Sequence, residues 1–184
     1  MNRIISLDLD GTLHDNTWSL SRSLAKKLFE LQDEGYLVGI NTGRELLGSL
    51  FFINSARFPF DFLCPGHSSF IPHPLSVERI MDLYNPGNIS IIKDHSMQGL
   101  GKVQSLQLVQ EITETLPENI LHIDNGPIES DRISFSESKY LLSSCGNDNE
   151  WNTIVLDKRG LVSSKSGPLG TLEILNSLDR VWGK

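Results

Sequence analysis

The sequence predicts an α/β fold, with a mainly parallel β-sheet whose strands are joined by crossover helices. Short apolar runs alternate along the chain with segments in which apolar residues recur every three or four positions, as they do on one face of a helix. The chain has 184 residues, which is enough for one well-packed core and too few for two ordinary domains. We therefore expect a single domain over residues 1–184.

Short runs that are rich in apolar residues predict the strands, and turn-forming residues mark the ends of several of them. Pro65 and Gly66 end the third run, and the Asn-Pro-Gly segment at residues 85–87 forms a turn before the fourth. The first run is apolar enough to be a buried strand. In chain order, the predicted strands are residues 3–7, 36–40, 61–64, 89–92, 119–123, 140–142 and 153–156.

Helical periodicity fills the segments between these runs. Ser19 or Ser21 is placed to cap the first helix, and Gly35 is placed to end it. Pro117 ends a later helix that begins near Leu100. The leucines that define the first helix are Leu20, Leu24, Leu28 and Leu31. The other predicted helices are residues 44–54, 75–84, 100–116 and 169–182.

Charge and composition argue against several classes of partner. The net charge of −7 at pH 7 and the scattered basic residues argue against nucleic acid, because contacts to its phosphate backbone need clustered lysines and arginines. No apolar stretch approaches the roughly 18 residues of a membrane span, and the chain turns acidic at Asp8 before a signal-peptide core could form. We expect a cytoplasmic protein with no nucleic-acid or membrane partner. Cys64 and Cys145 lack metal-ligand spacing and are expected to be reduced thiols.

The most specific feature is the segment Asp-Leu-Asp-Gly-Thr-Leu at residues 8–13, directly after the first predicted strand. Ligands of open α/β sheets bind beyond the carboxyl ends of the strands, so Asp8 and Asp10 are expected where chemistry occurs. The two carboxylates point the same way if the strand geometry continues, and such close like charges need a cation or a proton between them. Mg²⁺ fits, because it takes oxygen ligands and keeps water molecules for a substrate phosphate. A surface turn uses the same residue types, but this order after an apolar strand favours a functional motif.

Asp8, Asp10, Gly11 and Thr12 resemble the first motif of phosphatases of the haloacid dehalogenase superfamily. The resemblance implies a Rossmann-like, three-layer α/β/α sandwich and Mg²⁺ as cofactor. It implies that Asp8 attacks phosphorus to form an aspartyl-phosphate, while Asp10 protonates the leaving oxygen and then activates water to hydrolyse the intermediate. Dehalogenases lack the second aspartate and transport ATPases have lysine there, so Asp10 favours a phosphatase or a phosphomutase.

Two weaker segments are similar to the second and third motifs of this superfamily. The segment Gly-Ile-Asn-Thr-Gly-Arg at residues 39–44 most resembles the Cof-type and sucrose-phosphatase-like branches, and this implies that Thr42 binds a phosphoryl oxygen. Taken alone, Thr-Gly-Arg at residues 42–44 indicates a helix N-terminus with Thr42 as the capping residue. Lys102 matches the lysine that offsets charge on the phosphoryl group and the aspartates. Lys93 is a weaker candidate for the same role. The alternative for Lys102 is that it is an ordinary solvated lysine on a helix.

The fourth motif departs from the family pattern. The family has Gly-Asp after the strand and a second Asp a few residues later, whereas here Ile123 precedes Asp124. The resemblance implies that Asp124 ligates Mg²⁺, and the second acid is either Glu129 or Asp131. We prefer Asp131, because it lies about one helix before residues 145–147, Cys-Gly-Asn, which resemble a later Gly-Asn element of the Cof branch. A plain acidic turn is the alternative. The predicted metal ligands are Asp8, Asp10, Asp124 and Asp131.

Little of the chain is left for a lid over this site. Many relatives carry a cap domain that decides specificity, but only a short insertion at about residues 72–96 remains once the core elements are assigned. An open site admits a phosphorylated small molecule or a bulky phosphoester, or is covered by a neighbouring subunit in a homo-oligomer. It also loses part of the advantage of excluding water. The five histidines lack ligand spacing and are expected to be ordinary surface or hydrogen-bonded residues.

The leading hypothesis is a Mg²⁺-dependent phosphomonoesterase. A phosphotransferase or phosphomutase would form the same aspartyl-phosphate and pass it to a hydroxyl group instead of water. A third hypothesis is a binding or regulatory protein that kept the fold and lost activity through its altered fourth motif. Asp8, Asp10, Thr42 and Lys102 argue against the third hypothesis. Nothing in the sequence distinguishes a sugar phosphate, a nucleotide or a phosphoprotein as the substrate.

Overall fold

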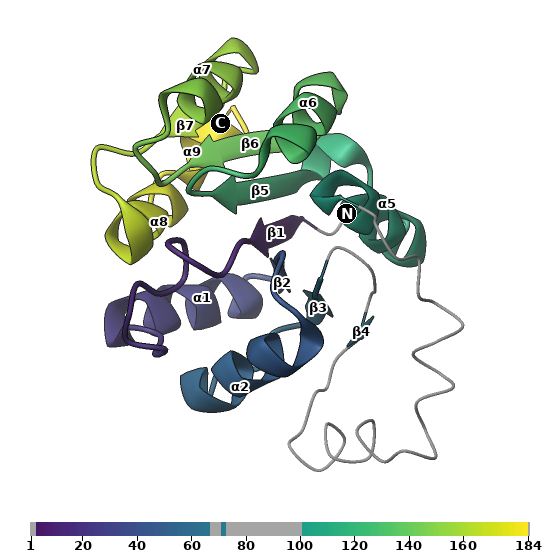
Figure 1. Cartoon of the computed structure of the whole chain (residues 1–184). Coiled ribbons are helices and arrows are strands. Elements are labelled where there is room, and N and C mark those ends of the chain that lie inside the picture. The colour runs from purple at the N-terminus through teal and green to yellow at the C-terminus, as the bar shows by residue number, and fades with distance from the viewer. Residues whose placement is uncertain (1–2, 67–70, 73–100, 184) are drawn as a thin grey trace.

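The strands follow the order β4-β3-β2-β1-β5-β6-β7 in one sheet (Figure 1). The computed structural model describes residues 3–66, 71–72 and 101–183. Within them every neighbouring pair of strands is parallel except β3 and β4. The predicted α/β fold with a mainly parallel sheet is therefore confirmed. The strands are β1 (Ile4–Leu7), β2 (Leu37–Asn41), β3 (Phe62–Cys64), β4 (Ile71–Pro72), β5 (Ile120–Asp124), β6 (Leu141–Ser144) and β7 (Leu161–Val162).

Helices cover both faces of the sheet and make a three-layer sandwich. In Figure 1, α5, α6 and α7 lie above the sheet, and α1, α2 and α8 lie below it. The helices below the sheet are α1 (Arg22–Asp33), α2 (Leu46–Ala56) and α8 (Gly167–Leu175), and the short α9 (Leu178–Val181) packs in the same core. The helices above it are α5 (Lys102–Thr113), α6 (Glu129–Glu137) and α7 (Asn149–Asp157), and the short 3₁₀ helix η1 (Pro117–Asn119) precedes β5.

Alternation along β1 divides its side chains between two separate cores. Ile5 and Leu7 join the core built with α1, α2 and α8, whereas Ile4 joins the core built with α5, α6 and α7. Ser6 shares the second face with Ile4, and the next residue on that face is Asp8. The alternation along β1 therefore directs Asp8, the residue that follows the strand, toward the layer that contains α5.

The register of the central strands brings three carboxyl ends to one edge of the sheet. Leu7 of β1 pairs with Ile40 of β2 and with Ile123 of β5. The backbone amide of Asp8 continues this ladder by donating to the carbonyl of Ile123 at 3.0 Å. Residues that follow β1, β2 and β5 are consequently neighbours in space.

The first helix shows how local signals set these elements. Its N-cap is Ser21, whose side chain accepts a hydrogen bond from the backbone amide of Leu24 at 3.3 Å. Gly35 follows the helix with a φ of +88°, a left-handed conformation that glycine adopts without a steric penalty. The cap and the end predicted for this helix are confirmed.

Two predicted elements are wrong in detail, and three observed elements were not predicted. Residues 153–156 were expected to form a strand, but they lie in α7, because Asp148 caps that helix and Trp151 and Val155 are buried at helical spacing. The expected helix over residues 169–182 is divided between α8 and α9. Helix α6 and the short strands β4 and β7 were not predicted.

Several predictions fall outside the described residues. They are the helix over residues 75–84, the strand over residues 89–92, Lys93, and the insertion at residues 72–96 apart from Pro72 itself. The single domain over residues 1–184 stays a prediction. Among the residues that are described, no helix has both the length and the apolar character needed to cross a membrane.

Candidate active site

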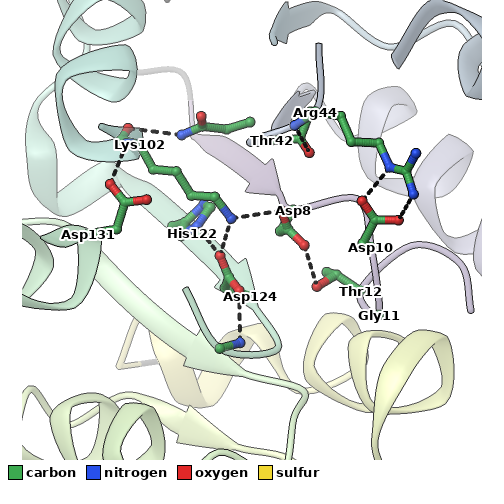
Figure 2. A network of polar contacts seen from close by, with 12 residues as sticks. Asp8, Asp10, Gly11, Thr12, Thr42, Arg44, Lys102, His122, Asp124 and Asp131 are labelled. Carbon is green, nitrogen blue, oxygen red and sulfur yellow. Dashed lines mark hydrogen bonds and ion pairs between the residues drawn. The ribbon is translucent and has the colours of Figure 1, made fainter. Parts of the chain in front are cut away.

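A buried lysine joins two buried aspartates at the carboxyl edge of the sheet. Asp8 follows β1, Asp124 ends β5, and Lys102 is the first residue of α5. The Nζ of Lys102 donates to Oδ1 of Asp8 at 2.7 Å and to Oδ2 of Asp124 at 2.5 Å (Figure 2). All three side chains are buried. The first and fourth predicted motifs, through Asp8 and Asp124, therefore meet the predicted lysine, although the three residues are far apart in the sequence.

Burial affects the two aspartates of this cluster differently. Burial raises the pKa of Asp8 to about 6, because desolvation disfavours its carboxylate, and the attraction of Lys102 offsets this only in part. For Asp124 burial acts in the same direction, but Lys102 and a hydrogen bond from His122 outweigh it and hold the pKa below its usual range. Burial disfavours the charge on Lys102 as well, and the two carboxylates outweigh it and raise the lysine pKa. At neutral pH, Lys102 is charged and Asp124 is ionised.

The backbone of Lys102 is held from two sides. Its amide donates to Oδ1 of Asp131 at 2.8 Å, and its carbonyl accepts from Nδ2 of Asn41 at 3.0 Å (Figure 2). Asp131 reaches this amide because Gly101 has no side chain: a Cβ atom there would lie 2.4 Å from Oδ1 of Asp131. Asp131 thus ties α6 to the N-terminus of α5. Asn41 was not predicted to have a role, although a polar residue at the end of an apolar strand was a usable signal.

The segment that follows β1 positions the second carboxylate oxygen of Asp8, Oδ2. The hydroxyl of Thr12 donates to Oδ2 of Asp8 at 3.3 Å, and the carbonyl of Thr12 accepts from the hydroxyl of Thr171 at 2.8 Å. Gly11 turns the chain with a φ of +70°. Cys145 also lies against Thr12, where burial raises the pKa of its thiol to about 11, so the thiol is uncharged at neutral pH. Cys64 and Cys145 are both free and buried.

Asp10 has different partners from Asp8. Arg44 binds both of its carboxylate oxygens: Nη2 donates to Oδ1 at 2.6 Å, and Nε donates to Oδ2 (Figure 2). Nε2 of His14 lies 3.4 Å from Oδ1 of Asp10. The guanidinium of Arg44 also lies over the ring of Trp18, 4.2 Å from its centroid. The strand geometry that would align Asp8 with Asp10 ends at Leu7, and Asp10 is half exposed in this second cluster.

Thr42 lies at the end of β2, at the same edge of the sheet, and is buried. Its hydroxyl accepts a hydrogen bond from the backbone amide of Arg44 at 3.2 Å. Helix α2 begins only at Leu46, with Glu45 as its N-cap. Thr42 therefore shapes the turn that carries Arg44, and binding of a phosphoryl oxygen by its hydroxyl stays a prediction.

His122 is a site residue that was not predicted from the sequence. It is fully buried on β5, two residues before Asp124 and on the same face of the strand. Burial lowers the pKa of its ring, so the ring is uncharged at neutral pH. The detectable signal was a polar residue alternating with apolar ones in a strand: Ile120, His122 and Asp124 on one face against Leu121 and Ile123 on the other.

Ile123 occupies the position where the superfamily pattern has glycine. Its side chain is fully buried in the core that includes α1 and α8. Asp124 contacts Lys102 of α5, which lies on the opposite face of the sheet. The isoleucine that replaces the glycine of the family pattern therefore packs in a hydrophobic core, away from the Asp124 carboxylate.

Of the four predicted metal ligands, Asp8 and Asp124 converge on the ammonium of Lys102. Asp10 instead binds Arg44, and Asp131 binds the backbone amide of Lys102. Glu129, the alternative to Asp131, is exposed at the start of α6. Within the described part of the chain, no three acidic, histidine or cysteine side chains form a group that could hold a metal ion. Mg²⁺ needs only one or two carboxylates, because water and substrate phosphate complete its shell. The oxygen donors of Asp8 and Asp124, which already attract the ammonium of Lys102, fit that ion.

Comparison with known proteins finds a likeness to the same superfamily over part of the chain. Residues 5–66 match the family model of haloacid dehalogenase-like hydrolases, and this range includes Asp8, Asp10 and Thr42. No curated protein matches the sequence. The resemblance to the haloacid dehalogenase superfamily is confirmed, and the Cof-type branch is consistent with it.

Solved structures share the fold over almost the whole chain at low sequence identity. The crystal structure of Thermoplasma acidophilum 0175 is 11% identical, with a TM-score of 0.65 over 100% of this chain and 99% of that one. A haloacid dehalogenase-like hydrolase from Bacteroides thetaiotaomicron is 14% identical, with a TM-score of 0.64 over 97% of this chain and 100% of that one. BT1666 from the same organism, studied among phosphatases of the haloalkanoate (HAD) enzyme superfamily, is 13% identical, with a TM-score of 0.63 over 98% and 95%. The Rossmann-like fold predicted from the sequence is confirmed by these likenesses.

Proposed function

We propose that the protein is a Mg²⁺-dependent phosphomonoesterase that works through an aspartyl-phosphate on Asp8. The observation that carries the proposal is the convergence of Asp8, Lys102 and Asp124 in a buried cluster at the carboxyl edge of the sheet. Such an edge is where open α/β sheets bind their ligands. The match of residues 5–66 to a hydrolase family supports the same class of reaction.

Asp8 is the nucleophile in this proposal. One carboxylate oxygen of Asp8 attacks phosphorus, the bond between phosphorus and the ester oxygen breaks, and Asp10 gives its proton to the departing oxygen. Asp10, now ionised, then takes a proton from water, and this water attacks phosphorus. The acyl phosphate bond breaks, inorganic phosphate leaves, and Asp8 regains its carboxylate. The half-exposed position of Asp10 suits a group that must meet both an alcohol and water.

Lys102 supplies the fixed positive charge for these steps. Its ammonium is buried between two carboxylates and needs little reorganisation during the reaction, because its backbone is held by Asn41 and Asp131. Mg²⁺, held by Asp8 and Asp124, would neutralise charge on the phosphoryl oxygens when bound. Thr42 would donate to a phosphoryl oxygen. The substrate would be a phosphorylated small molecule or a bulkier phosphoester.

The test is phosphate release from a generic aryl phosphate near neutral pH, with Mg²⁺ or with EDTA. We expect turnover with Mg²⁺, none with EDTA and none in Asp8→Asn. Asp33→Asn is the matched control, because Asp33 is an exposed carboxylate at the end of α1, and it should keep wild-type activity. Turnover that survives in Asp8→Asn would contradict the proposal, and so would a folded wild-type protein that shows no turnover with any phosphoester tested. Adding a sugar alcohol separates hydrolysis from transfer, because a phosphotransferase would form more phosphorylated alcohol than free phosphate.

A further inference from the structure

His122 is a buried titratable residue that the proposed reaction does not use. It pairs with Ser6 across the parallel β1–β5 ladder, so the two side chains lie side by side on one face of the sheet. Its Nδ1 is 3.1 Å from Oγ of Ser6, and its Nε2 is 3.2 Å from Oδ2 of Asp124. Its ring stacks on Phe135 of α6, with centroids 4.7 Å apart and planes inclined by 14°.

The partners of the ring determine where its proton lies. An ionised carboxylate can only accept hydrogen bonds, so Nε2 of His122 must donate to Asp124. Nδ1 of the same ring lies 3.1 Å from the Ser6 hydroxyl, which can pair with either form of this nitrogen. The result is a continuous chain of hydrogen bonds that links Ser6 to His122 and His122 to Asp124.

This chain completes the environment of the Asp124 carboxylate. Oδ1 accepts from the backbone amide of Gly126 at 2.8 Å, and Oδ2 accepts from Lys102 as well as from His122. The backbone carbonyl of Asp124 accepts from Nε1 of Trp151 at 3.3 Å. Lys102 is used by the proposed reaction, whereas His122 and Gly126 contact this carboxylate and have no other part in that reaction.

We propose that His122, oriented by Ser6, is a positioning residue that holds the Asp124 carboxylate for binding of Mg²⁺. The inference rests on the proposed function, in which Asp124 is a metal ligand. Outer partners of a ligand fix its orientation, and their loss weakens metal binding by about 10- to 100-fold. The stacking on Phe135 and the complete burial of His122 make the orientation of the ring a property of the folded core.

The experiment is titration calorimetry of the full chain with Mg²⁺ alone, in the absence of substrate. His122→Phe keeps an aromatic ring for stacking on Phe135 and removes both nitrogen atoms. We expect Mg²⁺ to bind about 10- to 100-fold more weakly to this variant than to the wild type. Ser6→Ala should weaken binding by a smaller factor, because His122 keeps its contact with Asp124 but loses the group that orients it.

Tyr140→Phe is the matched control. It removes the hydrogen bond that the buried Tyr140 hydroxyl donates to Oε1 of Gln110 at 3.2 Å. Tyr140 lies at the amino end of β6, away from the acidic cluster. Its affinity for Mg²⁺ should equal that of the wild type. Loss of affinity in Tyr140→Phe as large as in His122→Phe would overturn the inference, since both losses would then reflect a weakened core.

The inference is also overturned if folded His122→Phe binds Mg²⁺ as tightly as the wild type. If His122→Phe does not fold, wild-type affinity for Mg²⁺ in Ser6→Ala overturns it instead. A wild-type protein that binds no Mg²⁺ overturns it as well. The proposed function fails in a different way. Wild-type protein that binds Mg²⁺ but releases no phosphate contradicts the phosphatase, whereas the role of His122 in binding the ion would still be measured by the variants.

Discussion

The two halves of the candidate site differ in how much water reaches their charges. In the inner half, the side chains of Lys102, Asp8 and Asp124 are 6%, 8% and 1% exposed. In the outer half, those of Arg44 and Asp10 are 35% and 46% exposed. Both halves consist of ion pairs, and both include bonds shorter than 3 Å. What separates them is the medium around the charges.

This difference assigns the two halves different tasks. Coulomb interactions are much stronger where water is excluded, so the inner half can shift pKa values and stabilise charge on a phosphoryl group. The outer half is screened by solvent, and its Asp10 can exchange protons with a leaving group or with water. The inner half also carries the larger cost in stability, because buried charges depend on their partners.

Removing Lys102 should have the largest effect. Lys102→Met leaves two buried carboxylates facing each other, and we expect the free energy of unfolding to fall by about 3–5 kcal/mol, together with loss of phosphate release. Urea unfolding followed by circular dichroism measures the first and the aryl phosphate assay the second. Lys26→Met is the control, because Lys26 is 78% exposed beside Glu30, and it should change stability by less than about 0.5 kcal/mol. Equal stability of the two variants would show that the inner half is not a cluster of coupled charges.

Asp8→Asn should increase stability when no metal is present. The pKa of Asp8 is about 6 in the folded protein, whereas its ordinary value is 3.8. As the pH rises, the unfolded chain therefore loses this proton before the folded protein does. The stability of the wild type relative to the variant falls between pH 3.8 and about pH 6. Above pH 6 we expect Asp8→Asn to be more stable by about 1–3 kcal/mol. Urea unfolding in EDTA at pH 4 and pH 7.5 measures this difference. A constant difference between wild type and variant across that range would contradict a raised pKa for Asp8.

Removing Asp131 should have a moderate effect. Asp131→Ala leaves the buried amide of Lys102 without its acceptor, and we expect a loss of about 1–2 kcal/mol in the free energy of unfolding. Asp131→Asn should lose less, since its amide oxygen can accept the same hydrogen bond. Thermal unfolding compares the two variants. A loss of Mg²⁺ affinity in Asp131→Asn without loss of stability would support the ligand role predicted from the sequence.

Arg44→Gln should have the smallest effect on stability. The pair with Asp10 is partly exposed, so we expect a loss of less than about 1 kcal/mol, which decreases further at high salt. Urea unfolding in low and high salt, on wild type and Arg44→Gln, provides the measurement. A loss comparable to that of Lys102→Met would remove the distinction between the inner and outer halves.

The sequence predicted the features that depend on local signals. Residues 8–13 follow an apolar strand, and the strand, the acidic residues and the helix that begins at Lys102 were all visible in the pattern of residues. Asp8, Lys102 and Asp124 were also predicted to belong to one site, and the structure brings them together. The error at α7 arose because a short run of β-branched and apolar residues fits a strand as well as a buried helix face.

Other parts of the site depend on contacts that no local pattern encodes. His122 gains its role from the register between β1 and β5, which places Ser6 beside it, and from stacking on a residue of α6. Asp131 was predicted as a metal ligand from its place in the fourth motif, but it binds the backbone amide of Lys102, a contact that sequence motifs do not show. Asp10 was expected to align with Asp8, and the turn at Gly11 and the approach of Arg44 give it separate partners.

The central claim is that Asp8 becomes covalently phosphorylated. The most direct measurement is mass spectrometry of the protein mixed with an aryl phosphate and Mg²⁺ and quenched in acid within one turnover. We predict the added mass of one phosphoryl group on the peptide that contains Asp8, with no such peptide from Asp8→Asn or from samples in EDTA. Phosphate release by the wild type without any phosphorylated peptide, or with the phosphoryl group on another residue, would contradict it.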